Sequence, residues 1–113
     1  MSGLSQTFYI RENDRLPVIA ATMLDADSVA VPLGAASSVV FQMRLPGATS
    51  AKVNSTASIT STGSGTVEYV WAVGDTNTPG KYICSWQVTF SGKTETFPNS
   101  NNQDYVIITP EVA

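Results

Sequence analysis

Two polar stretches of this sequence contain side chains that could bind a ligand or a metal ion. Asp25 and Asp27 form an Asp-x-Asp pair, which can contribute to a calcium or sugar-nucleotide site. The competing interpretation, which we favour, is a turn in which both carboxylates cap backbone groups. The second stretch is either a calcium- or sugar-binding loop or a solvated loop, and we favour the solvated loop. Its members are Asn99, Asn101, Asn102, Gln103 and Asp104.

Aromatic residues and the single cysteine are candidates of a different kind. Four aromatic side chains could form a carbohydrate-binding platform, but each lies on the apolar side of its predicted strand, which favours core packing. They are Tyr69, Trp71, Tyr82 and Trp86. Cys84 has no histidine to activate it as a nucleophile, because the sequence contains none. A buried cysteine that packs as a small apolar residue needs no such partner.

Acid–base catalysis would need carboxylates held together, or a histidine. The available carboxylates include Glu12, Asp14, Glu68 and Glu95. Asp14 falls in a predicted turn and Glu68 points outward from its predicted strand, so the sequence does not pair them. No glycine-rich phosphate loop joins a strand to a helix. We therefore expect a protein that is not an enzyme, with no catalytic residues, no cofactor and no bound metal.

A length of 113 residues indicates a single domain spanning residues 1–113. Charged residues make up 13% of the sequence, whereas roughly 25% is usual. Six basic and nine acidic side chains give a net charge of −3, and the absence of a basic run disfavours nucleic-acid binding. The N-terminus lacks a signal-peptide pattern, and no apolar tract approaches the ~20 residues of a membrane helix. We therefore expect synthesis in a cytoplasm and no membrane insertion.

Turn-forming residues divide the chain into short segments with the alternating pattern of β-strands. No window shows the 3.6-residue spacing of a helix over three turns, although residues 71–75 could form one helical turn. Leu45 is the last residue predicted to face the core in the strand 38–45, and Val73 is the last in the strand 66–73. The predicted strands are 4–10, 16–24, 29–33, 38–45, 51–54, 56–60, 66–73, 82–90, 94–97 and 105–109, with a hairpin turn at 91–93.

The strand predicted at 82–90 has the largest apolar face, and this face must be covered by a second sheet. Ile83 is the one apolar residue on its opposite side. The core face contains Tyr82, Cys84, Trp86, Val88 and Phe90.

Residues 75–84 resemble the tyrosine corner of immunoglobulin-like domains, in which a tyrosine precedes the second core cysteine by two residues. We expect the Tyr82 hydroxyl to bond to backbone near residues 75–77. The partner cysteine is missing, because the comparable positions, 20–23, contain no cysteine. The predicted fold is all-β: an immunoglobulin-like antiparallel β-sandwich of about seven to nine strands with no disulfide.

The order and spacing of several short motifs also resemble a known family. The motifs are Arg-Glu-Asn-Asp-Arg-Leu-Pro (11–17), Val-Pro-Leu-Gly-Ala (31–35), Val-Val-Phe-Gln-Met-Arg (39–44), Gly-Thr-Val-Glu-Tyr-Val-Trp (65–71), Pro-Gly-Lys-Tyr (79–82), Trp-Gln-Val-Thr-Phe (86–90) and Thr-Phe-Pro-Asn (96–99). This pattern is similar to the N-terminal immunoglobulin-like domain of the phage baseplate upper protein and to small stand-alone phage and prophage proteins. The resemblance covers roughly residues 8–109.

This resemblance implies a bacteriophage virion protein that is made in the host cytoplasm and acts by protein–protein contacts. No coiled coil or receptor-binding fibre follows the domain, so we expect a tail, baseplate, neck or capsid-decorating subunit rather than a fibre bearer. Its expected partners are other virion proteins, with several copies in a symmetric particle. Expected contact elements are uncovered strand edges, such as 51–60, and the arms 1–5 and 111–113. The alternative is a carbohydrate-binding module that aids adsorption to the host.

Overall fold

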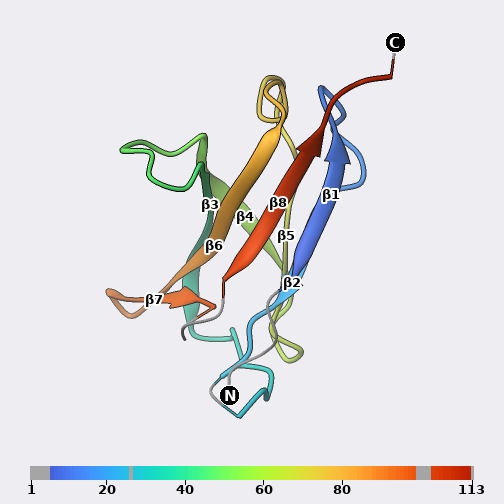
Figure 1. The fold of residues 1–113 in the computed structure, drawn as a ribbon. Coiled ribbons are helices and arrows are strands. Elements are labelled where there is room, and N and C mark those ends of the chain that lie inside the picture. The colour runs from blue at the N-terminus through green and yellow to red at the C-terminus, as the bar shows by residue number, and fades with distance from the viewer. Residues whose placement is uncertain (1–5, 26, 99–102, 113) are drawn as a thin grey trace.

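The computed structural model describes residues 6–25, 27–98 and 103–112, and the described residues form eight β-strands and no helix (Figure 1). All-β architecture with about eight strands was therefore predicted correctly. Cys84 is unpaired, as expected of a sandwich closed by packing alone. The strands are β1 (Thr7–Arg11), β2 (Ile19–Thr22), β3 (Ala36–Arg44), β4 (Val53–Ser61), β5 (Thr66–Tyr69), β6 (Gly80–Phe90), β7 (Lys93–Phe97) and β8 (Asp104–Thr109).

Hydrogen bonds connect the strands in the order β1-β8-β6-β3-β4-β5-β2, and β7 pairs with β6. The long strand β4 joins the two layers, because its first half pairs with β3 and its second half pairs with β5. Each half of β4 is paired on one side only, so the uncovered edge predicted at 51–60 is present: residues 53–57 form an edge of the layer that contains β3, and residues 58–61 form an edge of the layer that contains β5. The other edges are β1 and β2, together with the outer side of β7.

One strand pair departs from the predicted antiparallel arrangement. β1 lies parallel to β8, with Tyr9 opposite Ile107. Parallel neighbours cannot be joined by a tight hairpin, and here most of the chain separates the two strands. The sheet is consequently mixed, and both strands run toward the end of the molecule where the C-terminus lies (Figure 1).

A cluster of aromatic rings fills the space between the layers. Phe41 of β3 stacks on Tyr69 of β5 with ring centroids 5.0 Å apart, and it contacts Trp86 at 4.8 Å and Trp71 at 5.7 Å. These rings are all buried. Their burial explains why two sheets hold together without a disulfide, because each large aromatic side chain removes roughly 150–250 Å² from water.

The predicted core face of β6 is confirmed, and so is the tyrosine corner. Tyr82, Cys84, Trp86 and Val88 are buried, and Phe90 packs against the core while partly exposed. The Tyr82 hydroxyl donates a hydrogen bond of 2.7 Å to the carbonyl oxygen of residue 78. Its partner therefore lies one residue beyond the predicted range 75–77.

Several predicted strand boundaries were wrong for local reasons. Segments 51–54 and 56–60 form one strand, β4, and 29–33 contributes only an isolated bridge from Ala30 to Leu24. The strand predicted at 66–73 ends at Tyr69, because Asp75 accepts a 2.8 Å hydrogen bond from the Ala72 amide and turns the chain there. No helical turn forms at 71–75, which is loop and turn.

Two residues predicted to face the core are exposed for the same reason, namely that their strands end before them. Val73 is 83% exposed in the turn after β5. Leu45 is 43% exposed where Pro46 and Gly47 (φ 81°) end β3. In contrast, the predicted hairpin turn after β6 is present, and both of its central residues, Ser91 and Gly92, have the positive φ that two-residue hairpins require.

Candidate functional site

The Asp25–Asp27 pair forms a turn, as the favoured interpretation predicted, and the backbone capping is made by the Asp25 carboxylate. The Asp25 carboxylate accepts hydrogen bonds from the Asp27 amide at 2.9 Å and from the Val29 amide at 3.0 Å. A carboxylate occupied with two backbone donors is a turn-stabilising group. Across the described residues, no three His, Cys, Asp or Glu side chains come close enough together to hold a metal ion.

The oxygen-rich stretch near the C-terminus is described only in part. Asn99, Asn101 and Asn102 lie outside the described residues, whereas Gln103 is exposed and Asp104 begins β8. The Asp104 carboxylate is partly buried and accepts a 3.1 Å hydrogen bond from the Gln6 amide. Burial raises the pKa of Asp104, and the hydrogen bond from the Gln6 amide partly opposes this shift.

The four aromatic residues proposed as a possible carbohydrate platform belong to the core. The most exposed of them shows only 4% of its surface to solvent. Three also use their polar atoms for internal hydrogen bonds: the Trp71 indole donates to the carbonyl of Pro17 at 3.1 Å, the Tyr69 hydroxyl donates to Asp75, and the Tyr82 hydroxyl donates to the carbonyl of residue 78. Core packing is therefore confirmed for these rings, and a platform built from them is excluded.

Cys84 lies inside the sandwich with 3% of its surface exposed. Burial raises the pKa of its thiol to about 12, and the negative charge of the neighbouring Asp104 adds to the shift. A thiol with this pKa stays protonated at neutral pH, and the thiolate is the reactive form. Cys84 therefore acts as an apolar packing residue.

The remaining carboxylates are not gathered into one site. Glu12 and Asp14 lie in the connection between β1 and β2, Glu68 lies within β5, and Glu95 lies within β7 at the opposite end of the molecule. Glu12 accepts a long 3.4 Å hydrogen bond from the Glu111 amide near the C-terminus. These positions separate Glu68 and Glu95 from Glu12 and Asp14.

The sequence interpretation missed a group of apolar side chains on the outer face of the sheet. Strand register places Tyr9 beside Ile107, and Ile83 beside Tyr105. We call these four residues the outer apolar patch. Tyr9 is 64% exposed and the other three are partly exposed. The single apolar outlier in β6, Ile83, was the only signal of this patch in the sequence pattern.

The same sheet face becomes polar immediately next to this patch. In the next row of paired residues, Ser85 lies beside Gln42, and Gln42 lies beside Asn54. Their side chains form long hydrogen bonds of 3.4 and 3.5 Å. Polar residues are what the solvent-facing side of an antiparallel sheet normally carries. The outer apolar patch is therefore a local departure from the rest of its own face.

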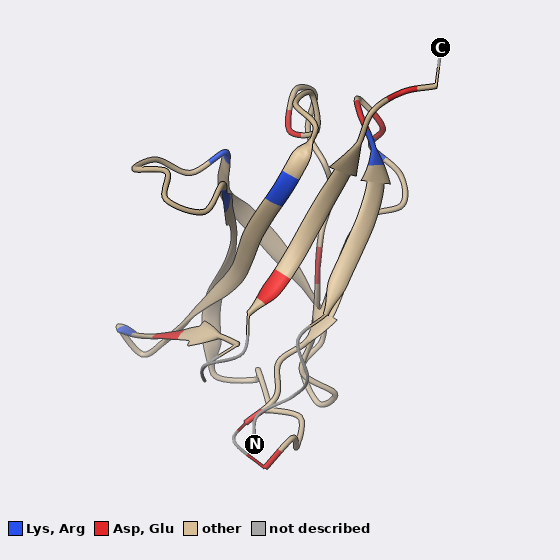
Figure 2. Cartoon of the chain, viewed as in Figure 1, with Lys and Arg blue, Asp and Glu red and all other residues tan. Residues whose placement is uncertain are grey.

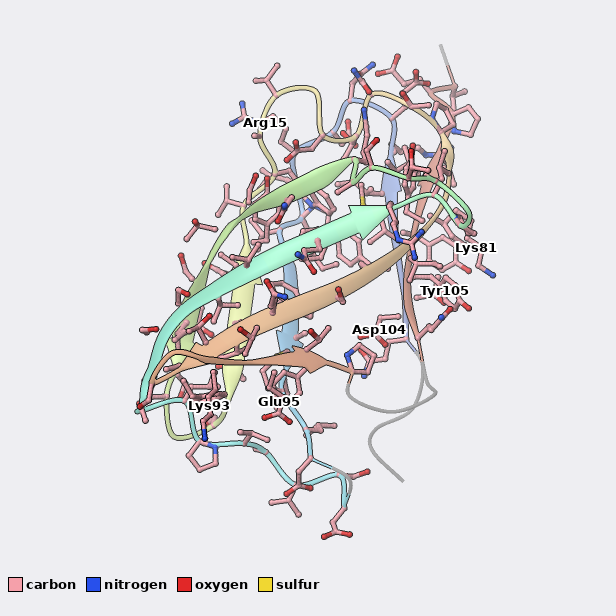
Figure 3. The ribbon with its side chains drawn as sticks, turned by 90° about the vertical axis from the view of Figure 1, so that its left-hand side faces the viewer. Arg15, Lys81, Lys93, Glu95, Asp104 and Tyr105 are labelled. Atoms are coloured by element: carbon pink, nitrogen blue, oxygen red, sulfur yellow. The ribbon has the colours of Figure 1, made fainter. Side chains whose placement is uncertain are left out.

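Three basic residues border the outer apolar patch on the side toward the C-terminus. The Lys81 ammonium lies 4.2 Å from the centre of the Tyr105 ring, a cation–π contact. Figure 3 shows these two side chains together at one side of the molecule. Arg11 ends β1 two residues after Tyr9, and Arg44 pairs with Ile83. The patch thus combines an apolar centre with three cations and no carboxylate at its paired positions.

A groove of about 470 Å³ lies between β2 and the strands β6, β7 and β8. Its walls include Ala20, Met23, Trp86 and Phe97, and Asp104 contributes the acidic group. It holds a single carboxylate and no second ionisable side chain among the described residues that line it. The groove offers shape and one negative charge, but no pair of groups for acid–base chemistry.

Comparison with protein-family models and with curated protein sequences found no match. None of the described segments forms a helix long and apolar enough to cross a membrane.

Proposed function

We propose that this protein is a non-enzymatic structural subunit of a bacteriophage particle, in the tail, baseplate, neck or capsid decoration. The proposal combines the motif order that resembles the baseplate immunoglobulin-like domain with one observation, the outer apolar patch. Four apolar side chains on a sheet face that would otherwise be solvated favour a surface covered by another protein.

In a particle with many copies, each contact can be weak. Attachment at one point raises the effective concentration at the next, so repeated modest contacts give strong overall binding. The partners are other virion proteins, and the protein reaches them in the host cytoplasm where it is made. The low content of charged residues, 13%, fits a surface that is partly covered in an assembly.

Mass spectrometry of purified particles tests this proposal directly. Peptides of this protein should copurify with the head and tail proteins at a constant ratio and should survive a density gradient and nuclease treatment. Complete absence from particles in which the other structural proteins are detected would overturn it. Neighbouring genes that encode head and tail proteins would support it independently, and a metabolic neighbourhood would argue against it.

Carbohydrate binding remains the second candidate, and one observation favours it. Tyr9 and Tyr105 are diagonal neighbours on the outer face, and adjacent exposed aromatic rings can stack on sugar rings. A glycan array and calorimetry with the binding glycans would test this. Tyr9→Ala should abolish glycan binding, whereas Val73→Ala, at another exposed apolar position, should leave it unchanged. Absence of binding by the unmodified protein removes this candidate.

A further inference from the structure

Charged side chains are distributed unequally between the two ends of the molecule (Figure 2). The strand directions place the connections 12–18, 45–52 and 70–79 at the end that holds the C-terminus, which we call the basic end. We call the opposite end the acidic end. The basic end carries Arg11, Arg15, Arg44, Lys52 and Lys81 against Glu12, Asp14, Asp75 and Glu111, and the acidic end carries Asp25, Asp27 and Glu95 against Lys93 alone. Asp104 lies between the two ends, opposite Cys84 in the middle of β6.

The outer apolar patch lies toward the basic end, so its natural partner is an acidic surface. Two copies joined patch to patch around a two-fold axis parallel to the strands would bring Arg11, Arg44 and Lys81 close to the same residues of the other copy. Like charges brought together across an interface oppose association. The cations therefore select against a symmetric pair in this orientation and favour a partner of opposite charge.

The acidic end of a second copy offers this chemistry. Asp27 is exposed there, and the neighbouring Val29 is 58% exposed. Val29 is an apolar side chain in the same turn as two carboxylates, which complements an apolar patch bordered by cations. Glu95 on β7 adds a carboxylate toward the same end (Figure 3).

We propose that the outer apolar patch of one copy binds the acidic end of the next, so that copies join head to tail. A pair joined head to tail still has one free patch and one free acidic end, so further copies can add until a ring or a tube forms. Rings and tubes are the forms that symmetric particles use. The inference builds on the proposed structural role by naming the partner as a second copy of this chain.

Sedimentation velocity over a range of protein concentrations tests the proposal with purified protein. The unmodified protein should form assemblies larger than a dimer, and these should dissociate between about 0.05 M and about 0.5 M salt, because salt screens exposed charges. Protein that stays monomeric at low salt and high concentration would overturn the inference. The particle-based test of the proposed function is separate, so the protein could pass that test through another partner.

Two charge-reversed variants identify the surfaces. The face variant carries Lys81→Glu and Arg44→Glu, and the end variant carries Asp27→Lys and Glu95→Lys. Each variant alone should be monomeric, because each now has the same sign on both surfaces. An equal mixture should assemble again, since each face meets an end of opposite charge. An end variant that assembles alone would show that the acidic end is not used and would overturn the proposal.

The apolar part of the contact is tested by Ile107→Thr, which keeps the β-branched shape while replacing the ethyl group on Cβ with a hydroxyl. Self-association should weaken at least about tenfold, as expected for a residue near the centre of an interface. Val73→Thr makes a matched change at an exposed site away from the patch and should change the dissociation constant less than about twofold. Equal effects of both substitutions would contradict the assignment. Thermal unfolding of each monomer establishes that the fold is intact.

Discussion

Removal of one hydroxyl group, by Tyr82→Phe, tests whether the tyrosine corner stabilises the sandwich. Tyr82 is 1% exposed, and its hydroxyl makes a single hydrogen bond, 2.7 Å long, to the carbonyl of Thr78. Phenylalanine keeps the ring in the core, so only the hydrogen bond is lost. A net loss of about 1 kcal/mol is expected, within the usual range for one intramolecular hydrogen bond. Thr78 is itself exposed, so water can hydrogen-bond to its carbonyl in the variant. The loss of stability is therefore smaller than it would be for a fully buried carbonyl left without a donor.

Chemical and thermal denaturation measure this effect. A loss of about 1 kcal/mol lowers the melting temperature of a domain of this size by about 3–6 °C. Tyr105→Phe is the matched control, because it removes a hydroxyl that donates to the exposed Gln103 at 3.1 Å. The control should change stability by less than about 0.5 kcal/mol. If both variants lose the same stability, or if Tyr82→Phe loses none, the corner does not stabilise the fold as argued.

Other properties follow from the buried and hydrogen-bonded groups. Cys84 should resist alkylation in the native protein at pH 8 and react in denaturant, since it is buried and its pKa is raised to about 12; rapid native-state labelling would contradict this. Asp104→Asn should raise the melting temperature at pH 7 but not below pH ~4, because a raised folded pKa means that ionisation destabilises the native state. Asp75→Ala should cost about 2 kcal/mol by removing the acceptor of Tyr69 and Ala72, whereas Asp14→Ala should cost little; equal losses would refute this role. Stability should fall above pH ~10, because Tyr69, with its pKa raised to about 12, ionises first in the unfolded chain, and Tyr69→Phe should reduce that slope.

The faces of the strands could be predicted because side chains alternate with a period of two, whatever the neighbouring strand is. This rule placed Cys84 and Trp86 in the core and left Ile83 outside. The rule fails where a strand ends, because the sequence pattern can continue to alternate after the backbone has turned away from the strand direction. Val73 is such a case, since the turn held by Asp75 directs it to solvent.

Pairing between distant strands could not be read from the pattern. The parallel alignment of β1 with β8, and the position of β4 between β3 and β5, depend on which edges remain free after the layers form. For the same reason the outer apolar patch was missed. Its members come from β1, β6 and β8, and each strand alone presents an unremarkable mixture of outward-facing residues. Only register brings Tyr9, Ile83 and Ile107 into one area.

Two of the free strand edges are poorly suited to contact with another protein. The free edge of β1 spans five residues, ends in Arg11 and belongs to a strand held only by a parallel pairing. Short edges with a terminal charge are poor templates for adding a strand. The free edge of β2 spans four residues and follows Pro17, which cannot donate a ladder hydrogen bond. The outer apolar patch, by contrast, rests on the central strand β6, whose register is fixed by β3 on one side and β8 on the other. A surface on such a rigid support loses little side-chain or backbone freedom on binding, so its modest apolar area converts more fully into affinity.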